Sequence, residues 1–271
     1  MEIEKNFQEY LNGKLLYGDD FSDEKIISWF NDQKENYCKE HEFSYSYHAL
    51  NYFYGYKFLP YITFEHVLSF GGATGEELLP ILDRIKHAIV LEPNRKFWTG
   101  LISPKIKYIY PDPLGNLNFD NDYFDLITCF GVLHHIPNCT KILLEFHRCL
   151  KKNGYILLRE PIISLDLKPH KKLKKRNFPT HRGIPLNIFR KILIKTNFKI
   201  IRESKCWSPV ATLPIDVIKK LFNIKTSTFN MPISVFLDKM MCFFLGFNTK
   251  YYRPNLVYKF GPTSVFYILT K

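Results

Sequence analysis

The sequence has six cysteines but no C-x-x-C pair and no short cysteine spacing of the kind found in disulfide frameworks. The residues nearest to a zinc-ligand set are His134, His135, Cys139 and Cys149, and their spacing fits no usual zinc site. We therefore expect reduced thiols, no bound metal and a cytoplasmic protein.

Long apolar runs are also missing. The longest, Ile233–Phe247, is interrupted by Asp238 and Lys239 and is too short to cross a bilayer. The opening residues, MEIEKNFQEY, are polar and acidic, unlike a secretory signal peptide. The sequence thus predicts neither a membrane span nor export.

Acidic residues are absent from residues 167–202, which contain twelve lysines and arginines. The whole chain of 271 residues has a net charge of +12, whereas residues 1–42 have a net charge of −6. A local excess of positive charge indicates a phosphate or polyanion site, and a solvated basic surface is the alternative interpretation. Few aromatic residues interrupt the basic stretch, which disfavours a base-stacking platform for nucleic acid.

Apolar runs alternate with helical patterns from residue 66 onward. Strands are predicted at 66–70, 87–91, 105–110, 124–130, 155–160, 198–203 and 264–269. Helices are predicted at 140–150, with Gly154 in its C-terminal cap, and at 186–196. This alternation predicts a doubly wound α/β fold, a mostly parallel sheet with helices on both faces.

Two segments lie outside this alternation. Residues 1–60 have apolar residues at helical spacing, with one helix after Ser22 and a second over 45–59. We expect these helices to form a lid over the ligand cleft of a domain spanning 61–271, and a partner-binding arm is the other interpretation. Residues 206–262 lose the periodicity, and a stretch that long is not structureless in a compact domain. We predict a helical insertion there, near an acceptor site.

Residues 66–75, HVLSFGGATG, combine a buried strand, a glycine turn and the start of a helix. Gly71, Gly72 and Gly75 let a ligand approach the backbone closely. The dinucleotide fingerprint G-x-G-x-x-G is not matched, because Glu76 replaces its last glycine. Glu76 and Glu77 would also repel a pyrophosphate at the helix start. S-adenosylmethionine, which has no phosphate and carries two positive groups, suits this acidic turn better.

Glu92 follows Gly71 by 21 residues and ends the second predicted strand. A carboxylate at this position is placed to accept hydrogen bonds from a ribose diol. The alternative is an ordinary surface acid at the end of a strand.

Five segments in order carry a family resemblance: VLSFGGATG, VLEP, YPDP, FDLITCFGVLHHIPN and LKKNGYILLREP. Over residues 62–161 the chain resembles class I S-adenosylmethionine-dependent methyltransferases, in the small-molecule, type 11/12-like branch. The flanks LYGDD, YHALN, REPI and HRGIP are similar to a subgroup associated with polysaccharide gene clusters. The resemblance implies a seven-stranded sheet in which Ser264–Leu269 is the reversed strand.

The resemblance also implies roles for single residues. It places residues 71–75 around the methionine part of the cofactor, Glu92 at the ribose and Asp112 near the adenine amino group. Phe130 and Gly131 would pass beneath the sulfonium. The cofactor residues expected in this way are Gly71, Gly72, Ala73, Gly75, Glu92, Asp112, Leu114, Phe130 and Gly131.

Three departures from the family pattern are visible. Ser69 stands where an acid is usual, and Ala73 stands where the middle glycine is usual. Pro113 follows Asp112 and has no N–H to offer the adenine, so we expect the Leu114 N–H to substitute.

Methyl transfer to oxygen usually needs a base in addition to positioning. The candidate bases are His134, His135, Glu160 and His181. Each histidine could instead satisfy loop carbonyls. Motif resemblance makes none of them a base.

The acceptor is expected to be a small molecule or glycan, such as a sugar or nucleotide-sugar, with a phosphate or similar anion. Arg159 and Arg182 are its predicted binding residues, and Arg182 belongs to the basic loop 167–182. The rival interpretations are a nucleic-acid-binding protein and a non-catalytic protein on the same fold.

Overall fold

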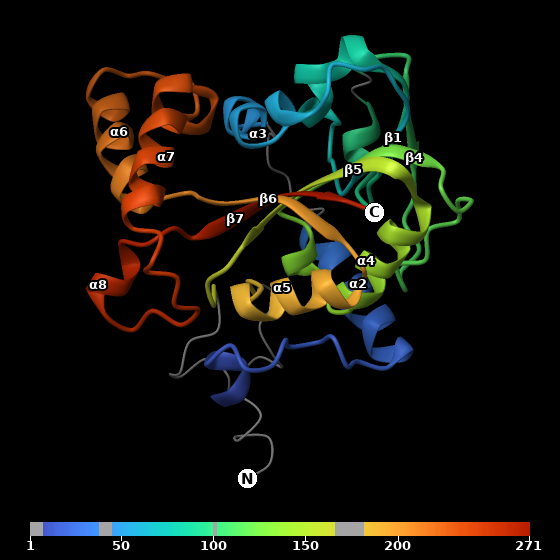
Figure 1. The fold of residues 1–271 in the computed structure, drawn as a ribbon, viewed down its shortest axis with the longest axis horizontal. Coiled ribbons are helices and arrows are strands. Elements are labelled where there is room, and N and C mark those ends of the chain that lie inside the picture. Colours follow the sequence, from blue (N-terminus) through green and yellow to red (C-terminus); the bar gives the residue numbers. More distant parts are fainter. Residues whose placement is uncertain (1–7, 38–44, 100–101, 166–181) are drawn as a thin grey trace.

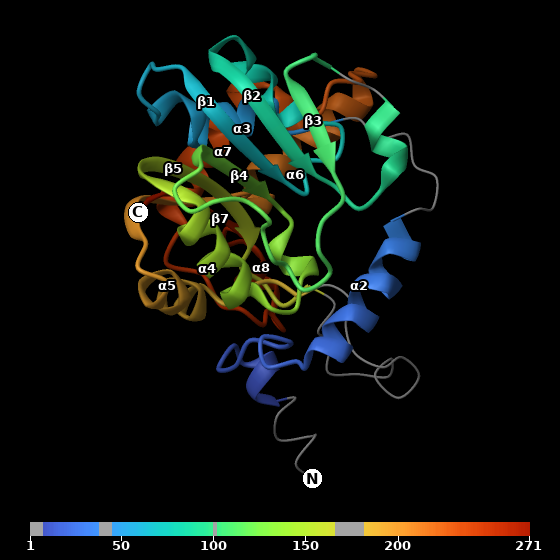
Figure 2. The same cartoon turned by 90° about the vertical axis from the view of Figure 1, so that its right-hand side faces the viewer.

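The computed structural model describes residues 8–37, 45–99, 102–165 and 182–271. These residues form a seven-stranded sheet of order β3-β2-β1-β4-β5-β7-β6 (Figures 1 and 2). Neighbouring strands are parallel except β7, which is antiparallel to both β5 and β6. The strands are β1 (Phe64–Phe70), β2 (Ile85–Leu91), β3 (Ile106–Ile109), β4 (Phe124–Phe130), β5 (Leu150–Pro161), β6 (Lys199–Cys206) and β7 (Ser264–Thr270). The predicted doubly wound fold with a reversed β7 is confirmed.

Helices cover both faces of the sheet. In Figure 1, α3, α6 and α7 lie on one side of the sheet, and α4 and α5 lie on the other. The α-helices are α2 (Asp23–Tyr37), α3 (His48–Tyr54), α4 (Cys139–Cys149), α5 (Leu186–Lys195), α6 (Pro209–Leu221), α7 (Pro232–Phe244) and α8 (Leu256–Lys259). Short 3₁₀ helices are η1 (Tyr56–Phe58), η2 (Glu76–Arg84), η3 (Arg95–Thr99), η4 (Leu133–His135) and η5 (Thr228–Asn230).

Continuous apolar runs identify the central strands because both of their faces are buried. In β1, Val67 packs into one core with Leu50 of α3, and its neighbour Leu68 packs into the other core with Phe146 of α4. Successive side chains of a strand point to opposite faces, so a strand between two helical layers has no solvated side. The predicted bounds of β4 match the structure, and those of β1 differ only at its start.

Gly154 is not a helix cap, and this part of the prediction is wrong. Helix α4 ends at Cys149, Leu150 is already extended with φ −76° and ψ 135°, and β5 begins there. A Cβ on Gly154 would lie 2.7 Å from Cδ1 of Leu150 and 3.0 Å from the carbonyl oxygen of Lys151. A side chain at this position would therefore crowd the first residues of β5.

The predicted helix after the glycine turn is a 3₁₀ helix, η2. Pro80 lies inside it, and proline removes the N–H that an α-helical hydrogen bond would use at that position. Gly75, with φ +76°, precedes η2 in the left-handed conformation.

Ala73 also has a positive φ, +47°. A side chain is disfavoured in that conformation, which explains why a glycine is the usual residue at this place in the turn. The departure from the family pattern therefore introduces local backbone strain.

Replacing Ala73 by glycine should remove this strain. We expect the free energy of unfolding to rise by about 1 kcal/mol and Tm by roughly 2–4 °C, measured by thermal unfolding. The control is Ala88→Gly in β2, where the alanine is buried and does not have positive φ, and where stability should fall. If Ala73→Gly lowers Tm as Ala88→Gly does, the strain argument is wrong.

Candidate functional site

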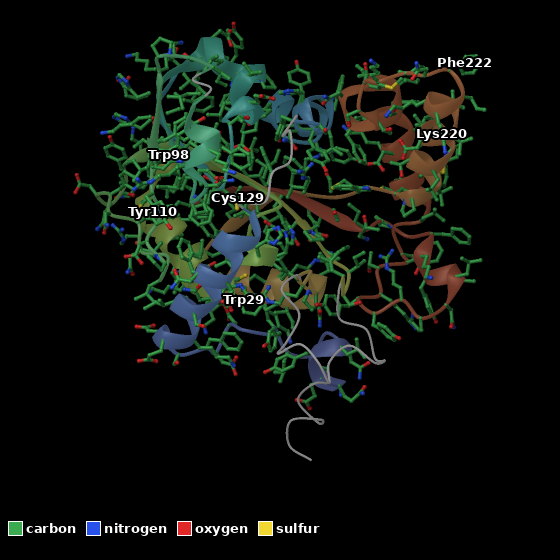
Figure 3. The ribbon with its side chains drawn as sticks, turned by 180° about the vertical axis from the view of Figure 1, so that it is seen from behind. Trp29, Trp98, Tyr110, Cys129, Lys220 and Phe222 are labelled. Atoms are coloured by element: carbon green, nitrogen blue, oxygen red, sulfur yellow. The ribbon has the colours of Figure 1, made fainter. Side chains whose placement is uncertain are left out.

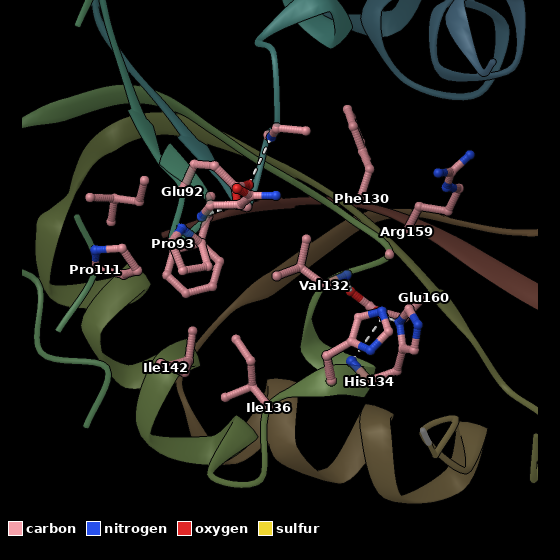
Figure 4. Close-up of a pocket in the computed structure, with 18 of the residues that line it drawn as sticks. Glu92, Pro93, Pro111, Phe130, Val132, His134, Ile136, Ile142, Arg159 and Glu160 are labelled. Carbon is pink, nitrogen blue, oxygen red and sulfur yellow. Dashed lines mark hydrogen bonds and ion pairs between the residues drawn. The ribbon is translucent and has the colours of Figure 1, made fainter. Parts of the chain in front are cut away.

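A cavity of about 1120 Å³ opens at the carboxyl ends of β1, β2, β4 and β5 (Figure 4). It lies where the strand order reverses between β1 and β4, the place where open α/β sheets bind ligands. Eleven of the predicted site residues line it: Gly71, Gly72, Ala73, Glu92, Asp112, Phe130, Gly131, His134, His135, Arg159 and Glu160.

Glu92 joins the end of β2 to the glycine turn. Its carboxylate accepts hydrogen bonds from the backbone N–H groups of Ala73, at 3.1 Å, and Asn94, at 2.8 Å. The side chain is only 6% exposed, and burial raises its pKa to about 7. A buried hydrogen-bond acceptor therefore faces the cavity at the position expected for a ribose.

Glu77 compensates for the missing acid at Ser69. The carboxylate of Glu77 accepts hydrogen bonds from the hydroxyls of Ser69, at 2.7 Å, and Thr128, at 2.6 Å. A Cβ on Gly72 would collide with Ser69 Oγ and lie 3.4 Å from Cδ of Glu77. Burial raises the pKa of Glu77. The acid beneath the glycine turn is thus supplied by η2 and not by β1.

Asp112 lies on the cavity wall, and the Leu114 N–H bonds to its side chain. That N–H donates to the Asp112 carboxylate at 2.6 Å, and Leu114 is not on the wall of the cavity. The N–H that we expect to replace that of Pro113 at the adenine is thus hydrogen-bonded to Asp112 in the structure.

Glu160 orients His134. Its carboxylate accepts hydrogen bonds from the N–H groups of Val132 and Leu133, both at 2.8 Å, and of His134, at 3.2 Å. The same carboxylate lies 2.9 Å from Nδ1 of His134 (Figure 4). Glu160 is fully buried, so these contacts fix both the loop after β4 and the orientation of the imidazole.

Arg159 points to the other side of the sheet from Glu160 (Figure 4). Its guanidinium lies over the ring of Tyr47, 4.2 Å from the centroid, with Phe130 and Trp207 at 5.8 and 6.0 Å. The side chain is 5% exposed, and its Nη1 has no hydrogen-bond partner among the described residues. The cavity wall thus contains a buried cation with donor capacity that the described protein atoms do not use.

Arg182 is not on the cavity wall. Its buried guanidinium donates to the backbone carbonyls of Tyr17, Ile136 and Pro137, so it ties the N-terminal segment to the loop after η4. These partners differ from the phosphate that the sequence analysis expects. His181 and the rest of the basic loop up to residue 181 lie outside the described residues. Gly75 is not on the wall either.

Segments far apart in the sequence complete the wall. Ile26, Trp29 and Phe30 of α2 and residues 45–47 all line the cavity. The Trp29 indole N–H donates to the carbonyl of His135 at 2.8 Å, which fixes α2 beside η4. No local pattern identifies these partners from sequence, because the contact spans 106 positions.

A family model described as a methyltransferase domain matches residues 45–202, more than half of the chain. No curated protein matches the sequence. Among solved structures, an S-adenosylmethionine-dependent methyltransferase from Mesorhizobium loti is 15% identical, with a TM-score of 0.51 and coverage of 79% of this chain and 94% of that one.

Two further structures show the same fold. A chain from the Haloferax volcanii complex that contains the Trm112 methyltransferase activator is 12% identical, with a TM-score of 0.52. The match covers 91% of this chain and 97% of that one. The [4+2]-cyclase SpnF is 12% identical, with a TM-score of 0.53. The match covers 91% of this chain and 93% of that one.

The buried Glu92 carboxylate, the glycine turn and the acid beneath it fit the S-adenosylmethionine that such a domain uses. The match over residues 45–202 and the strand order agree with this fit. The chain belongs to the class I S-adenosylmethionine-dependent methyltransferase family.

Proposed function

We propose that the protein methylates a small-molecule or glycan-like acceptor, with sugars and nucleotide-sugars as the first candidates, bound inside the cavity beside its cofactor. The observation that supports this is the size and lining of the cavity. Its volume of about 1120 Å³ exceeds the usual range of about 300–1,000 Å³ for a site that holds one small ligand. The wall also offers a buried cation and an oriented imidazole, which suit an anionic acceptor that loses a proton.

When bound, S-adenosylmethionine supplies a methyl group on a sulfonium, a carbon already activated for displacement. The chain then has to position the acceptor and accept its proton. His134 is the proposed base because Glu160 holds its Nδ1 and so directs the proton-accepting role to Nε2. Glu160 itself is occupied by three backbone N–H groups and His134, so we propose it as a positioning residue.

Arg159 is proposed to bind an anionic group of the acceptor, a phosphate or carboxylate. A guanidinium can donate two parallel hydrogen bonds to such a group, and in a buried site these bonds are strong. The aromatic rings of Tyr47, Phe130 and Trp207 hold the guanidinium in place without using its donors.

We propose that the N-terminal helices and the insertion 206–262 together form a lid over the cavity. Helix α2 contributes Trp29 to the wall, and Trp207 contributes from the start of the insertion 206–262. Closure of these segments over the ligands would exclude water from the reacting groups.

Glu92→Gln should weaken binding of S-adenosylhomocysteine, the demethylated cofactor, by about 1.5–3 kcal/mol, because the amide loses the charged acceptor for the ribose hydroxyls. With a pKa of about 7, the wild-type carboxyl is mostly protonated at pH 6 and ionised at pH 8. Wild-type affinity, measured by calorimetry, should therefore rise over this interval, and the variant should be flat. Glu65→Gln, at the opposite end of β1, is the control. Unchanged affinity in Glu92→Gln would remove Glu92 from the ribose site.

His134→Asn should lower kcat by about 10²–10⁴-fold and leave S-adenosylhomocysteine affinity unchanged, as expected for loss of a general base. The assay follows the labelled methyl group into sugar and nucleotide-sugar acceptors. Glu160→Gln should shift the pH profile of kcat, because it alters the hydrogen bond at Nδ1. If His135→Asn lowers kcat more than His134→Asn does, the assignment of the base is wrong.

Arg159→Met keeps an unbranched side chain among the aromatic rings but removes the charge. We expect the acceptor KM to rise by roughly 10- to 150-fold, the range for hydrogen bonds to a charged group. Binding of S-adenosylhomocysteine and of methylthioadenosine, which lacks the amino acid end, should not change. Selective weakening of S-adenosylhomocysteine would instead assign Arg159 to the cofactor carboxylate and overturn this proposal.

A further inference from the structure

Helix α6 presents a stripe of large apolar side chains to solvent. Leu213, Val217 and Leu221 recur every four residues, which places them on one side of the helix, and Ile218 and Phe222 flank them. All five are exposed, Leu221 by 75%. The buried residues of α6 are small ones near its start.

Helix α7 departs from the usual amphipathic pattern. Its buried positions are Ser234, Val235, Asp238 and Cys242, whereas Phe236 and Phe243 are exposed, the latter by 82%. A helix that packs on a domain normally turns its large apolar side chains inward. The exposed phenylalanines of α7 therefore do not pack into the core of the domain.

Asp238 fixes this orientation. Its buried carboxylate accepts hydrogen bonds from the Tyr54 hydroxyl at 2.8 Å and from the backbone N–H groups of Trp207 and Ser208 at 3.0 and 2.6 Å. Turning α7 to bury its phenylalanines would expose these groups and break all three bonds. These hydrogen bonds therefore hold the exposed phenylalanines of α7 on the outer side of the helix.

Basic residues outnumber acids in the part of the chain that carries the α6–α7 face, which we define as the exposed apolar residues of these two helices and Phe247. Residues 209–260 contain seven Lys and Arg and two acids, Asp216 on α6 and the buried Asp238. Lys220 and Lys225 are exposed at the end of α6 and in the turn that follows, and Lys220 is labelled with Phe222 in Figure 3. Figure 1 shows α6 and α7 at one edge of the molecule, away from the N-terminal segment.

We propose that the α6–α7 face binds the surface of an anionic lipid bilayer. Exposed phenylalanine and leucine with lysines beside them are the composition of helices that lie in the headgroup region. Each helix has 13 residues and is ~20 Å long, shorter than the hydrocarbon core. No helix within the described ranges is long and apolar enough to cross a membrane.

The positive charge beside the α6–α7 face favours an anionic bilayer over a second copy of this chain as its binding partner. A symmetric contact would bring the lysines of both copies toward each other, and few acids are available to neutralise them. Anionic headgroups supply the opposite charge over the whole face, and the apolar side chains gain a non-aqueous environment.

The test is co-sedimentation of the full chain with vesicles of phosphatidylglycerol mixed with phosphatidylcholine, and with vesicles of phosphatidylcholine alone. We expect binding to the anionic vesicles that weakens as salt is raised, and much weaker binding to the neutral ones. A wild-type protein that stays in the supernatant with both vesicles overturns the proposal.

Substitutions test whether the α6–α7 face, and not another part of the surface, binds the vesicles. Phe243→Ser with Phe247→Ser should lower vesicle binding about tenfold or more, since both rings are over 80% exposed and free to insert. Lys220→Glu with Lys225→Glu should remove the preference for anionic lipid. The matched control is Tyr61→Ser, an equally exposed ring before β1, which should bind as the wild type does.

Far-ultraviolet circular dichroism checks that each variant keeps the wild-type helix content. If light scattering shows a dimer that Phe243→Ser dissociates, the face is a self-association surface and the proposal is wrong. Equal vesicle binding by the phenylalanine variant and the Tyr61→Ser control would also overturn it.

Discussion

The buried carboxylate of Glu77 is the interaction on which the cofactor corner depends. It receives hydroxyl hydrogen bonds from Ser69 of β1 and Thr128 of β4, so it joins the two strands between which the sheet order reverses. Burying a carboxylate is costly unless its oxygens are paired, and these two hydroxyls offset that cost. The small side chain of Ser69 makes room for Glu77 directly beneath Gly72. Ser69 and Glu77 therefore act together beneath the glycine turn.

The sequence predicted most of the fold, because buried parallel strands leave a local pattern. Continuous apolar runs marked β1 and β4, and the turn after β1 was visible from its glycines. The sequence also predicted Glu92 and Glu160 at strand ends. It could not predict how Glu77, Trp29 or Arg159 would be used. Their partners lie in other elements, and no local spacing records a contact such as that between Arg159 and Tyr47.

Charge was the least reliable guide to the site. The basic stretch pointed to the loop 167–182, which lies almost wholly outside the described residues. The described arginine of that loop, Arg182, uses its guanidinium to hold the backbone carbonyls of Tyr17 in the N-terminal segment and of Ile136 and Pro137 after η4. Arg159 at the end of β5 lines the cavity, as Lys96 does, although neither belongs to the basic stretch. Both arginines are buried, and their hydrogen-bond partners distinguish them, a property that cannot be read from a count of charges.

The contacts of Asp238 in the run Ile233–Phe247 also could not be read from the sequence. In the sequence, Asp238 and Lys239 interrupt it and exclude a membrane span. In the structure, Asp238 is buried and bound by Tyr54, Trp207 and Ser208, so the interruption is what orients the helix. Because Asp238 occupies the inner side with Val235 and Cys242, Phe236 and Phe243 face outward. Trp207 lines the cavity and donates its N–H to Asp238, so one short segment connects the cavity wall to the helix that carries the exposed face.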